Sequence, residues 1–250
     1  MKWFLITLMI LITPLGGLAS EAASFFAEAK TLAKSEPLKA RKLFQVAGLK
    51  FEELAVARPE YAAEALYNAG NAYFFAEEQG RALYAWRRAE QVAPFNPELK
   101  SNIGYLIELG EGQGVVTMGA SALQKIRAVF PVRIRVTLVM LFFLAAMAGG
   151  AVWQWRAKKV RVFVMIFSGL AFVFALSLLF TFLRGPRNGV VLSFQAEARK
   201  GDGYIYEPAF AAPLAEATEF RVSKIRGDWV QAKLTDGNEG WLPASEIGLW

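Results

Sequence analysis

The 250-residue sequence contains no cysteine and no histidine. The first absence excludes disulfides and thiol catalysis, and the second removes the commonest general base and metal ligand. Aspartate is scarce, occurring only in turn-like sequence at Asp202, Asp228 and Asp236. Acid–base chemistry would depend on glutamates spread along predicted helical surfaces, where a solvated side chain is the simpler interpretation. We therefore expect no catalytic residues, no metal site, no cofactor and no enzymatic activity.

The formal net charge of +6 is concentrated beside long apolar runs. Residues 20–130 carry 13 basic and 13 acidic side chains, and residues 185–250 carry 7 and 9. The remaining basic residues are Lys2 and those at the borders of two apolar runs. This distribution indicates membrane topology and argues against a phosphate-binding face, so we expect no nucleic-acid partner.

The two apolar runs are residues 136–155 and 162–183, and neither contains an ionisable side chain. Each is long enough to cross a bilayer as a helix. The short turn between them carries Arg156, Lys158, Lys159 and Arg161. Residues 133–184 are therefore predicted to form a transmembrane hairpin that enters and leaves the lipid bilayer on one side. Small residues spaced four apart, such as Ala145 and Gly149, favour packing of the two spans on each other, or against another protein's helix.

The first 19 residues have the order of a secretory signal peptide. Lys2 precedes the apolar run Trp3–Leu15, and the small residues Gly17 and Ala19 come after it. The alternative is an uncleaved anchor. Both interpretations export the chain beyond Ala19, and the basic turn of the hairpin then lies in the cytoplasm, as the positive-inside rule expects.

The strongest motif lies between Tyr61 and Pro94. It consists of residues 65–74 (ALYNAGNAYF) followed by Ala82, Trp86, Ala89 and Pro94. This spacing resembles a tetratricopeptide repeat, in which Gly70 and Ala82 would stand where two antiparallel helices come close. Tyr73, Trp86 and Ala89 would fill the space between and behind the helices. Ala69 departs from the pattern, which usually has a larger apolar residue there.

One such helix pair cannot bury its apolar face alone, so neighbours are required. Upstream, apolar residues recur at helical spacing, and Pro59 lies 35 residues before Pro94, which predicts a degenerate repeat whose first helix lies around Ala22–Ala33. Downstream, Asn96 is predicted to cap a helix that begins at Pro97. Residues 20–114 therefore form the predicted helical domain, and residues 115–132 a linker or an amphipathic helix on the membrane surface.

The concave face of such a repeat would be lined by its first helices, and it is a candidate groove for a partner's peptide or helix. Four residues would line or border this groove: Tyr67, Asn71, Phe74 and Phe75. The alternative is that the aromatic rings pack on the neighbouring repeat, and that Asn71 only braces the backbone.

In residues 189–250, apolar and polar side chains alternate, as they do along β-strands. Short β-prone runs at 190–194, 219–225, 229–234 and 239–242 are separated by turns, of which those at Gly227 and Gly237 are predicted tight hairpins. The order GDWV, DG and GWLPAS closely resembles the second half of a bacterial SH3-like domain, which implies a small all-β barrel. Trp229 and Trp241 are candidate partner-binding residues, or core residues, and the core role is favoured for at least one.

In this order, the signal, repeat, hairpin and SH3-like domain resemble the BatE family of the Bacteroides aerotolerance (Bat) operon. The resemblance implies a non-catalytic subunit of a bacterial inner-membrane complex linked to oxidative or envelope stress, with both soluble domains in the periplasm. It also implies Bat membrane proteins with von Willebrand A domains as partners and, indirectly, a MoxR-type AAA+ ATPase.

The residues leave two alternative functions open. The SH3-like domain could instead hold peptidoglycan, which would make the chain a cell-envelope sensor or tether. A hydrolase that uses carboxylates would require two glutamates to converge in the fold.

Overall fold

The computed structural model describes residues 15–111, 132–152, 158–183 and 188–250. They fall into two compact units, one within residues 1–118 and 186–250 and the other within 119–185. The first unit contains a helical part and a sheet part, and the second contains two apolar helices. The predicted combination of an α-helical region and a small antiparallel β-region is confirmed at this level. Residues 1–14 of the predicted signal peptide lie outside the described residues, and so does the predicted linker except for Val132.

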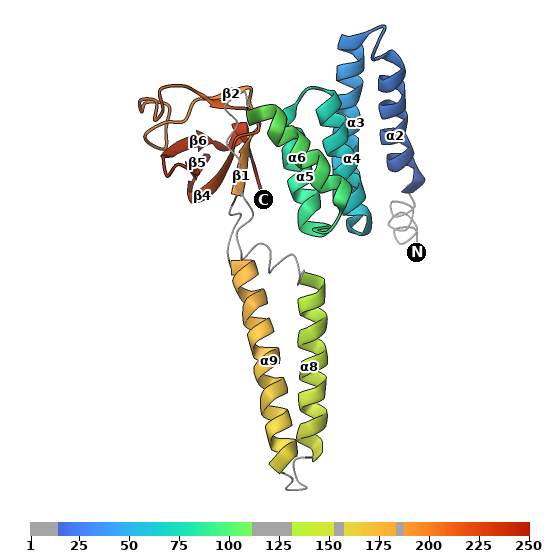
Figure 1. Ribbon diagram of the computed structural model, residues 1–250, viewed down its shortest axis with the longest axis vertical. Helices are drawn as coiled ribbons and strands as arrows, with labels where there is room; N and C mark the ends of the chain where they lie inside the picture. The colour runs from blue at the N-terminus through green and yellow to red at the C-terminus, as the bar shows by residue number, and fades with distance from the viewer. Residues whose placement is uncertain (1–14, 112–131, 153–157, 184–187) are drawn as a thin grey trace, which may run out of the picture. The chain divides into compact units, whose positions relative to one another are not determined.

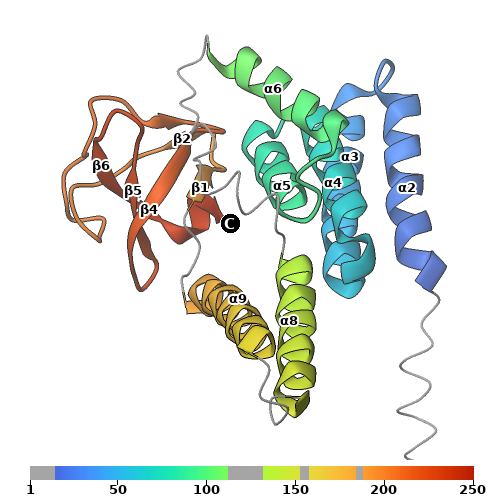
Figure 2. The same cartoon turned by 60° about the horizontal axis from the view of Figure 1, so that its bottom comes forward.

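The helical part is an array of antiparallel helices that pack in chain order, as Figures 1 and 2 show. Its elements are α2 (Leu15–Leu32), α3 (Pro37–Ala57), the 3-10 turn η1 (Pro59–Tyr61), α4 (Ala62–Phe75), α5 (Gln79–Val92) and α6 (Pro97–Glu111). Helix α2 begins at Leu15, earlier than the predicted start near Ala22, and the residues in between are also helical. Gly17 and Ala19, the small residues of the predicted signal, therefore lie within α2.

Local sequence explains where α6 begins. The Asn96 side-chain oxygen accepts a hydrogen bond from the Leu99 backbone N–H at 2.9 Å, and Pro97 occupies the first helical position. The apolar stripe of this helix is buried and consists of Leu99, Ile103 and Leu106. The cap and the stripe together direct α6 onto the helix pair before it.

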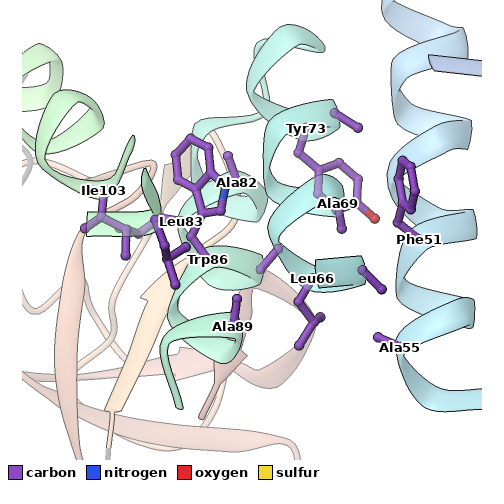
Figure 3. Close-up of a cluster of buried hydrophobic side chains, with 14 of the residues drawn as sticks. Phe51, Ala55, Leu66, Ala69, Tyr73, Ala82, Leu83, Trp86, Ala89 and Ile103 are labelled. Carbon is purple, nitrogen blue, oxygen red and sulfur yellow. The ribbon is translucent and has the colours of Figure 1, made fainter. Parts of the chain in front are cut away.

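Small residues let α4 and α5 approach closely. A Cβ atom on Gly70 would lie 2.3 Å from the Trp86 ring, so only glycine fits at this position. Ala82 is also buried there, and Figure 3 shows its side chain with Trp86 between the two helices. On the other side of α4, Gly48 of α3 admits the Tyr73 ring in the same way. The predicted roles of Gly70, Ala82, Tyr73 and Trp86 in packing are therefore confirmed.

The second unit contains α8 (Val132–Val152) and α9 (Lys158–Leu183), which lie side by side in Figure 1. A Cβ atom on Gly149 would lie 2.6 Å from a methyl group of Val164, so this glycine allows the two helices to approach. Arg135 is buried, and its guanidinium donates a hydrogen bond to the Ser177 hydroxyl at 2.9 Å. Both contacts agree with packing of the two helices on each other.

One described stretch, Arg161–Leu179, is long and apolar enough to cross a membrane, and Ile134–Gly150 is a shorter apolar helix. The two spans at 136–155 and 162–183 therefore stay a prediction. Arg156 of the expected turn lies outside the described residues.

The sheet part is a five-stranded antiparallel sheet with the order β6-β5-β4-β1-β7, accompanied by a two-stranded sheet of β2 and β3. Its elements are β1 (Asn188–Val191), β2 (Gln195–Ala196), β3 (Leu214–Ala215), β4 (Glu219–Arg226), β5 (Trp229–Lys233), β6 (Glu239–Pro243), the 3-10 turn η3 (Ala244–Glu246) and β7 (Ile247–Leu249). The four longer strands were predicted. Sequence analysis missed β2, β3 and β7, which are too short to show a repeating pattern.

The predicted hairpin turns are confirmed. Arg226 pairs with Trp229 across the first turn, and Lys233 pairs with Glu239 across the second. Gly227 and Gly237 have φ angles of 54° and 89°, in the left-handed region that favours glycine.

The sheet part packs against α5, a contact that sequence analysis did not anticipate. The Arg87 guanidinium forms an ion pair with Glu219, at 2.6 Å from Nε to Oε1, and the Glu219 side chain is 1% exposed. Nearby, the Tyr84 hydroxyl donates to the Leu249 carbonyl at 3.3 Å, and its ring contacts Trp250. The helical and sheet parts are therefore joined by polar as well as apolar contacts.

The close packing at Gly70 predicts that Gly70→Ala lowers the stability of the helical part. The added methyl group would collide with Trp86, which is 2% exposed and whose indole N–H is bound to the Tyr67 carbonyl. Overpacking of this kind costs about 1–3 kcal/mol. Chemical denaturation of the purified chain in detergent, followed by circular dichroism, would measure the loss. Gly104→Ala is the control, because a Cβ atom there meets nothing within 4 Å, and it is expected to be neutral or stabilising.

The buried ion pair predicts that Arg87→Met is strongly destabilising. It would leave the Glu219 carboxylate buried without its cation, at a cost of about 3–5 kcal/mol. The double variant R87M/E219M should recover most of that loss in the same denaturation measurement. Arg41→Ala, which breaks an ion pair of two partly exposed side chains with Glu77, should change stability by less than about 1 kcal/mol. Equal effects of R41A and R87M would refute this role of the buried pair.

Candidate interaction surfaces

A continuous row of aromatic rings crosses four helices of the helical part. Phe26 of α2 and Phe75 of α4 both contact Phe44 of α3, with ring centroids 5.3 Å apart in each case. Phe75 also contacts Phe74, which in turn lies 5.9 Å from Tyr105 of α6. Although the rings touch one another, Phe75 is 51% exposed and Tyr105 is 58% exposed. We call these five residues the aromatic row.

Polar side chains between α4 and α6 form a hydrogen-bonded group beside Phe74. The Asn102 amide nitrogen donates to the Asn71 side-chain oxygen at 2.9 Å and to the Tyr67 hydroxyl at 3.4 Å. The Tyr67 carbonyl accepts the Trp86 indole N–H at 3.2 Å. These bonds hold Tyr67 and Asn71 in defined positions between the core and the surface.

The four residues predicted to line or border a groove all lie on α4. Tyr67, Asn71 and Phe74 are half-buried, and Phe75 is exposed. Phe74 and Phe75 pack on neighbouring helices, while Phe75 keeps half of its surface open, so the partner groove stays a prediction. Sequence analysis missed Asn102 and Tyr105. The repeat length could have found Asn102, since it lies 35 residues after Tyr67, the same shift that separates Pro59 and Pro94.

A second candidate surface lies on the sheet part, around Trp229. The Tyr204 ring meets the Trp229 ring edge-on, with centroids 4.9 Å apart. The Arg226 guanidinium lies over the Trp241 ring and also pairs with Asp202 at 3.3 Å. Trp241 is only 7% exposed, which places it in the core, whereas Trp229 is half-buried and borders the surface.

Backbone pairing holds the loop that carries Tyr204. Arg199 and Trp241 exchange two N–H···O=C hydrogen bonds of 2.8 Å each. Within the loop, a Cβ atom on Gly201 would lie 2.6 Å from the Tyr206 ring, so the glycine lets that ring fold back onto the backbone. The basic-then-glycine order of residues 199–201 thus forms a loop that is anchored to β6.

Two glutamates come together at the start of α5. Glu216 accepts a hydrogen bond from the Gly80 backbone N–H at 2.8 Å, and Glu78 accepts one from the Gln45 amide at 2.8 Å. Burial raises the pKa of Glu216, the nearby Glu78 charge raises it further, and the bond from Gly80 and the charge of Arg81 oppose the shift. Glu216 therefore satisfies one of the unpaired N–H groups at the helix start, which is a structural role.

Tyr73 is the most strongly perturbed phenol in the described residues. Burial, together with the Glu52 carboxylate that accepts a hydrogen bond from the Tyr73 hydroxyl at 2.9 Å, raises the pKa of Tyr73 far above its ordinary value. Glu52 also pairs with Arg88 at 2.8 Å. The Tyr73 hydroxyl is therefore a fixed donor that links α4 to α3.

Comparisons with protein-family models, curated proteins and solved structures return no match for this chain. The resemblances to a tetratricopeptide repeat, an SH3-like domain and the BatE family therefore stay predictions.

The environment of Glu216 predicts a pH-dependent effect of Glu216→Gln. Because the folded-state pKa is raised, the glutamate's contribution to stability is fully present below its unfolded value of about 4.3 and is lost as the pH rises through the folded value. Glutamine stays neutral and keeps an oxygen that can accept the Gly80 N–H. We therefore expect E216Q to have a higher Tm than the original chain at pH 7, and the difference to shrink toward pH 4.

Thermal unfolding followed by circular dichroism across this pH range would measure the difference. Glu207→Gln is the matched control, because Lys200 lowers the pKa of this exposed glutamate, and its Tm at pH 7 should be unchanged or lower. A lower Tm for E216Q at pH 7 would show that the charged carboxylate is required.

Proposed function

We propose that the chain is a non-catalytic, membrane-anchored scaffold whose helical and sheet parts bind partner proteins outside the cytoplasm. The observation that carries this proposal is the aromatic row, which leaves Phe75 and Tyr105 half open beside the polar pair Asn71 and Asn102. Exposed aromatic side chains next to fixed hydrogen-bonding groups are typical of protein interaction surfaces.

The packing of α2 to α6 supports a tetratricopeptide-like arrangement. Helix pairs α2–α3 and α4–α5 follow one another, and Gly48 of α3 and Gly70 of α4 each admit a large ring from the next helix, Tyr73 and Trp86 respectively. In this proposal α6 closes the array, and the aromatic row lies along the surface that an extended peptide or an amphipathic helix would occupy. Apolar side chains of the partner would contact Phe75 and Tyr105, while Asn71 and Asn102 would bind its polar groups.

The sheet part supports an SH3-like barrel as the second interaction module. Its strands are short, its hairpins are tight, and the loop of Tyr204 lies against Trp229. The helix α9, which is apolar enough to cross a membrane, and its partner α8 supply the proposed anchor. Following the resemblance to BatE, the partners would be Bat membrane proteins with von Willebrand A domains and, through them, a MoxR-type ATPase.

Substitution of the two open rings tests the proposal. F75A/Y105A should reduce recovery of von Willebrand A domain proteins on affinity purification in mild detergent by at least tenfold, because aromatic anchors in interfaces are worth about 2 kcal/mol or more each. Phe95→Ala is the control, since Phe95 is 66% exposed but lies outside the aromatic row. Circular dichroism would verify that all variants are folded. Recovery of the original chain alone, or equal recovery with F75A/Y105A, would contradict the proposal.

Peptidoglycan binding is a second candidate, favoured by the open Tyr204 ring beside Trp229. Tyr204 is 69% exposed, and an exposed aromatic face can stack on sugar rings. The full chain in detergent would be sedimented with purified sacculi, with Tyr204→Ala as the comparison. Co-sedimentation that Y204A weakens would support this candidate, and absence of the chain from the pellet would remove it.

A further inference from the structure

Helix α3 carries apolar side chains on two faces. One face is buried against α2 and α4, and Figure 3 shows Phe51 and Ala55 of this face pointing toward α4. On the other face, Leu38 is 74% exposed, Val56 is 73% exposed and Leu49 is 47% exposed. A helix at the surface of an array needs only its buried face for folding, so the exposed apolar face has no role within the helical part.

The exposed apolar residues are aligned along the helix rather than scattered. Leu49 follows Leu38 by eleven residues and Val56 follows Leu49 by seven, which correspond to about three turns and about two turns. Two exposed charged residues and one half-buried valine lie beside this row, and all six side chains fall within an arc of about 80° around the helix. We call these six residues the outer stripe: Leu38, Lys42, Val46, Leu49, Glu53 and Val56.

The outer stripe is symmetric about its middle. Three pairs of its residues have midpoints at position 47 or between 47 and 48: Leu38 with Val56, Lys42 with Glu53, and Val46 with Leu49. Apolar residues are therefore matched with apolar residues, and the lysine is matched with the glutamate. In an antiparallel pair of identical helices, each residue faces the one that lies equally far beyond the two-fold axis. The stripe has the symmetry that such an axis through the middle of α3 requires.

The two charges of the stripe distinguish an antiparallel pair from a parallel one. In an antiparallel pair, Lys42 of each copy would face Glu53 of the other copy. In a parallel pair, Lys42 would face Lys42 and Glu53 would face Glu53, and both contacts would be repulsive. Complementary charges set the orientation in which two surfaces associate, so the antiparallel pair is favoured.

The other charged residues of α3 already have partners within the chain. They form ion pairs as follows: Lys39 with Glu36, Arg41 with Glu77, Lys50 with Glu21 and Glu53, and Glu52 with Arg88. Lys42 joins none of the ion pairs found in the described part of the chain. Glu53 binds Lys50 through Oε2 at 3.1 Å, and its other carboxylate oxygen can accept a second lysine.

We propose that two copies of the chain associate through the outer stripe as an antiparallel, two-fold pair of α3 helices. Another partner could cover an apolar face, but only a second copy accounts for the symmetry of the stripe. This inference goes beyond the proposed function and does not depend on it, because the open rings of the aromatic row, Phe75 and Tyr105, lie on α4 and α6. A dimer of this kind would carry two copies of each candidate interaction surface.

The absence of cysteine allows a direct test of the helix orientation by cross-linking. In the antiparallel pair, position 38 of one copy lies beside position 56 of the other, whereas the two copies of position 38 are separated by about 27 Å along the helices. Leu38→Cys and Val56→Cys change equally exposed side chains. The full-length variants would be expressed separately and together, purified in mild detergent and treated with a short bismaleimide.

We expect at least tenfold more cross-linked dimer from the co-expressed variants than from either variant alone. Efficient cross-linking of L38C to itself would indicate a parallel pair and would overturn the proposal. Absence of cross-linked dimer from all three samples would overturn it as well.

Exchange of the two charges tests the pairing of Lys42 with Glu53. Sedimentation equilibrium of the full chain in density-matched detergent at low salt would measure the Kd of the dimer. K42E and E53K each place like charges at both contacts, so we expect either variant to raise the Kd at least fivefold. The double variant K42E/E53K restores opposite charges, and its Kd should return to within twofold of the original value. A monomer at every concentration, or no recovery in the double variant, would refute the arrangement.

A third variant tests the apolar centre of the stripe. Leu49→Asp places a carboxylate beside the two-fold axis in both copies and should raise the Kd at least twentyfold. Leu109→Asp is the matched control, because Leu109 is 42% exposed on α6, and it should leave the Kd unchanged. Circular dichroism would verify that both variants are folded. Equal effects of L49D and L109D would contradict the proposal. F75A/Y105A should dimerise like the original chain, so a failure of the proposed function would be distinguishable from a failure of dimerisation.

Discussion

The ion pair of Arg87 and Glu219 is the interaction on which the described arrangement of the first unit depends. Glu219 is 1% exposed, and a carboxylate so deeply buried is costly unless a cation and hydrogen bonds compensate for lost water. Arg87 provides both, since its Nε and Nη2 atoms bind the two carboxylate oxygens at 2.6 and 3.1 Å. The pair therefore specifies one docking position for the sheet part on α5.

This docking leaves the candidate surfaces open. The sheet part contacts α5 through residues such as Tyr84 and Arg87, while the exposed aromatic rings, Phe75 and Tyr105, lie on α4 and α6. Trp229, together with the Tyr204 ring that it contacts, is at the other end of the β4–β5 pairing from Glu219. A scaffold built this way would present two modules in a defined geometry, and partners bound to both would be held at a fixed spacing.

Much of the fold could be predicted because short-range signals agree with it. Asn96 and Pro97 start α6, Gly227 and Gly237 form hairpin turns, and Gly70 stands where Trp86 must fit. The predicted site residues on α4 come together for the same reason, since a helix places Tyr67, Asn71 and Phe74 on neighbouring turns. Asn102 and Tyr105 were missed because their role appears only when α6 packs beside α4.

The sequence by itself determined the helices, the longer strands, the turns and the apolar runs, because each depends on residues within a few positions of one another. Only the tertiary structure decided that the sheet part docks on α5. The partners Arg87 and Glu219 are 132 residues apart, and each looks like an ordinary surface charge in its own segment. Burial makes them a pair, and burial depends on how distant segments pack, which no local pattern encodes.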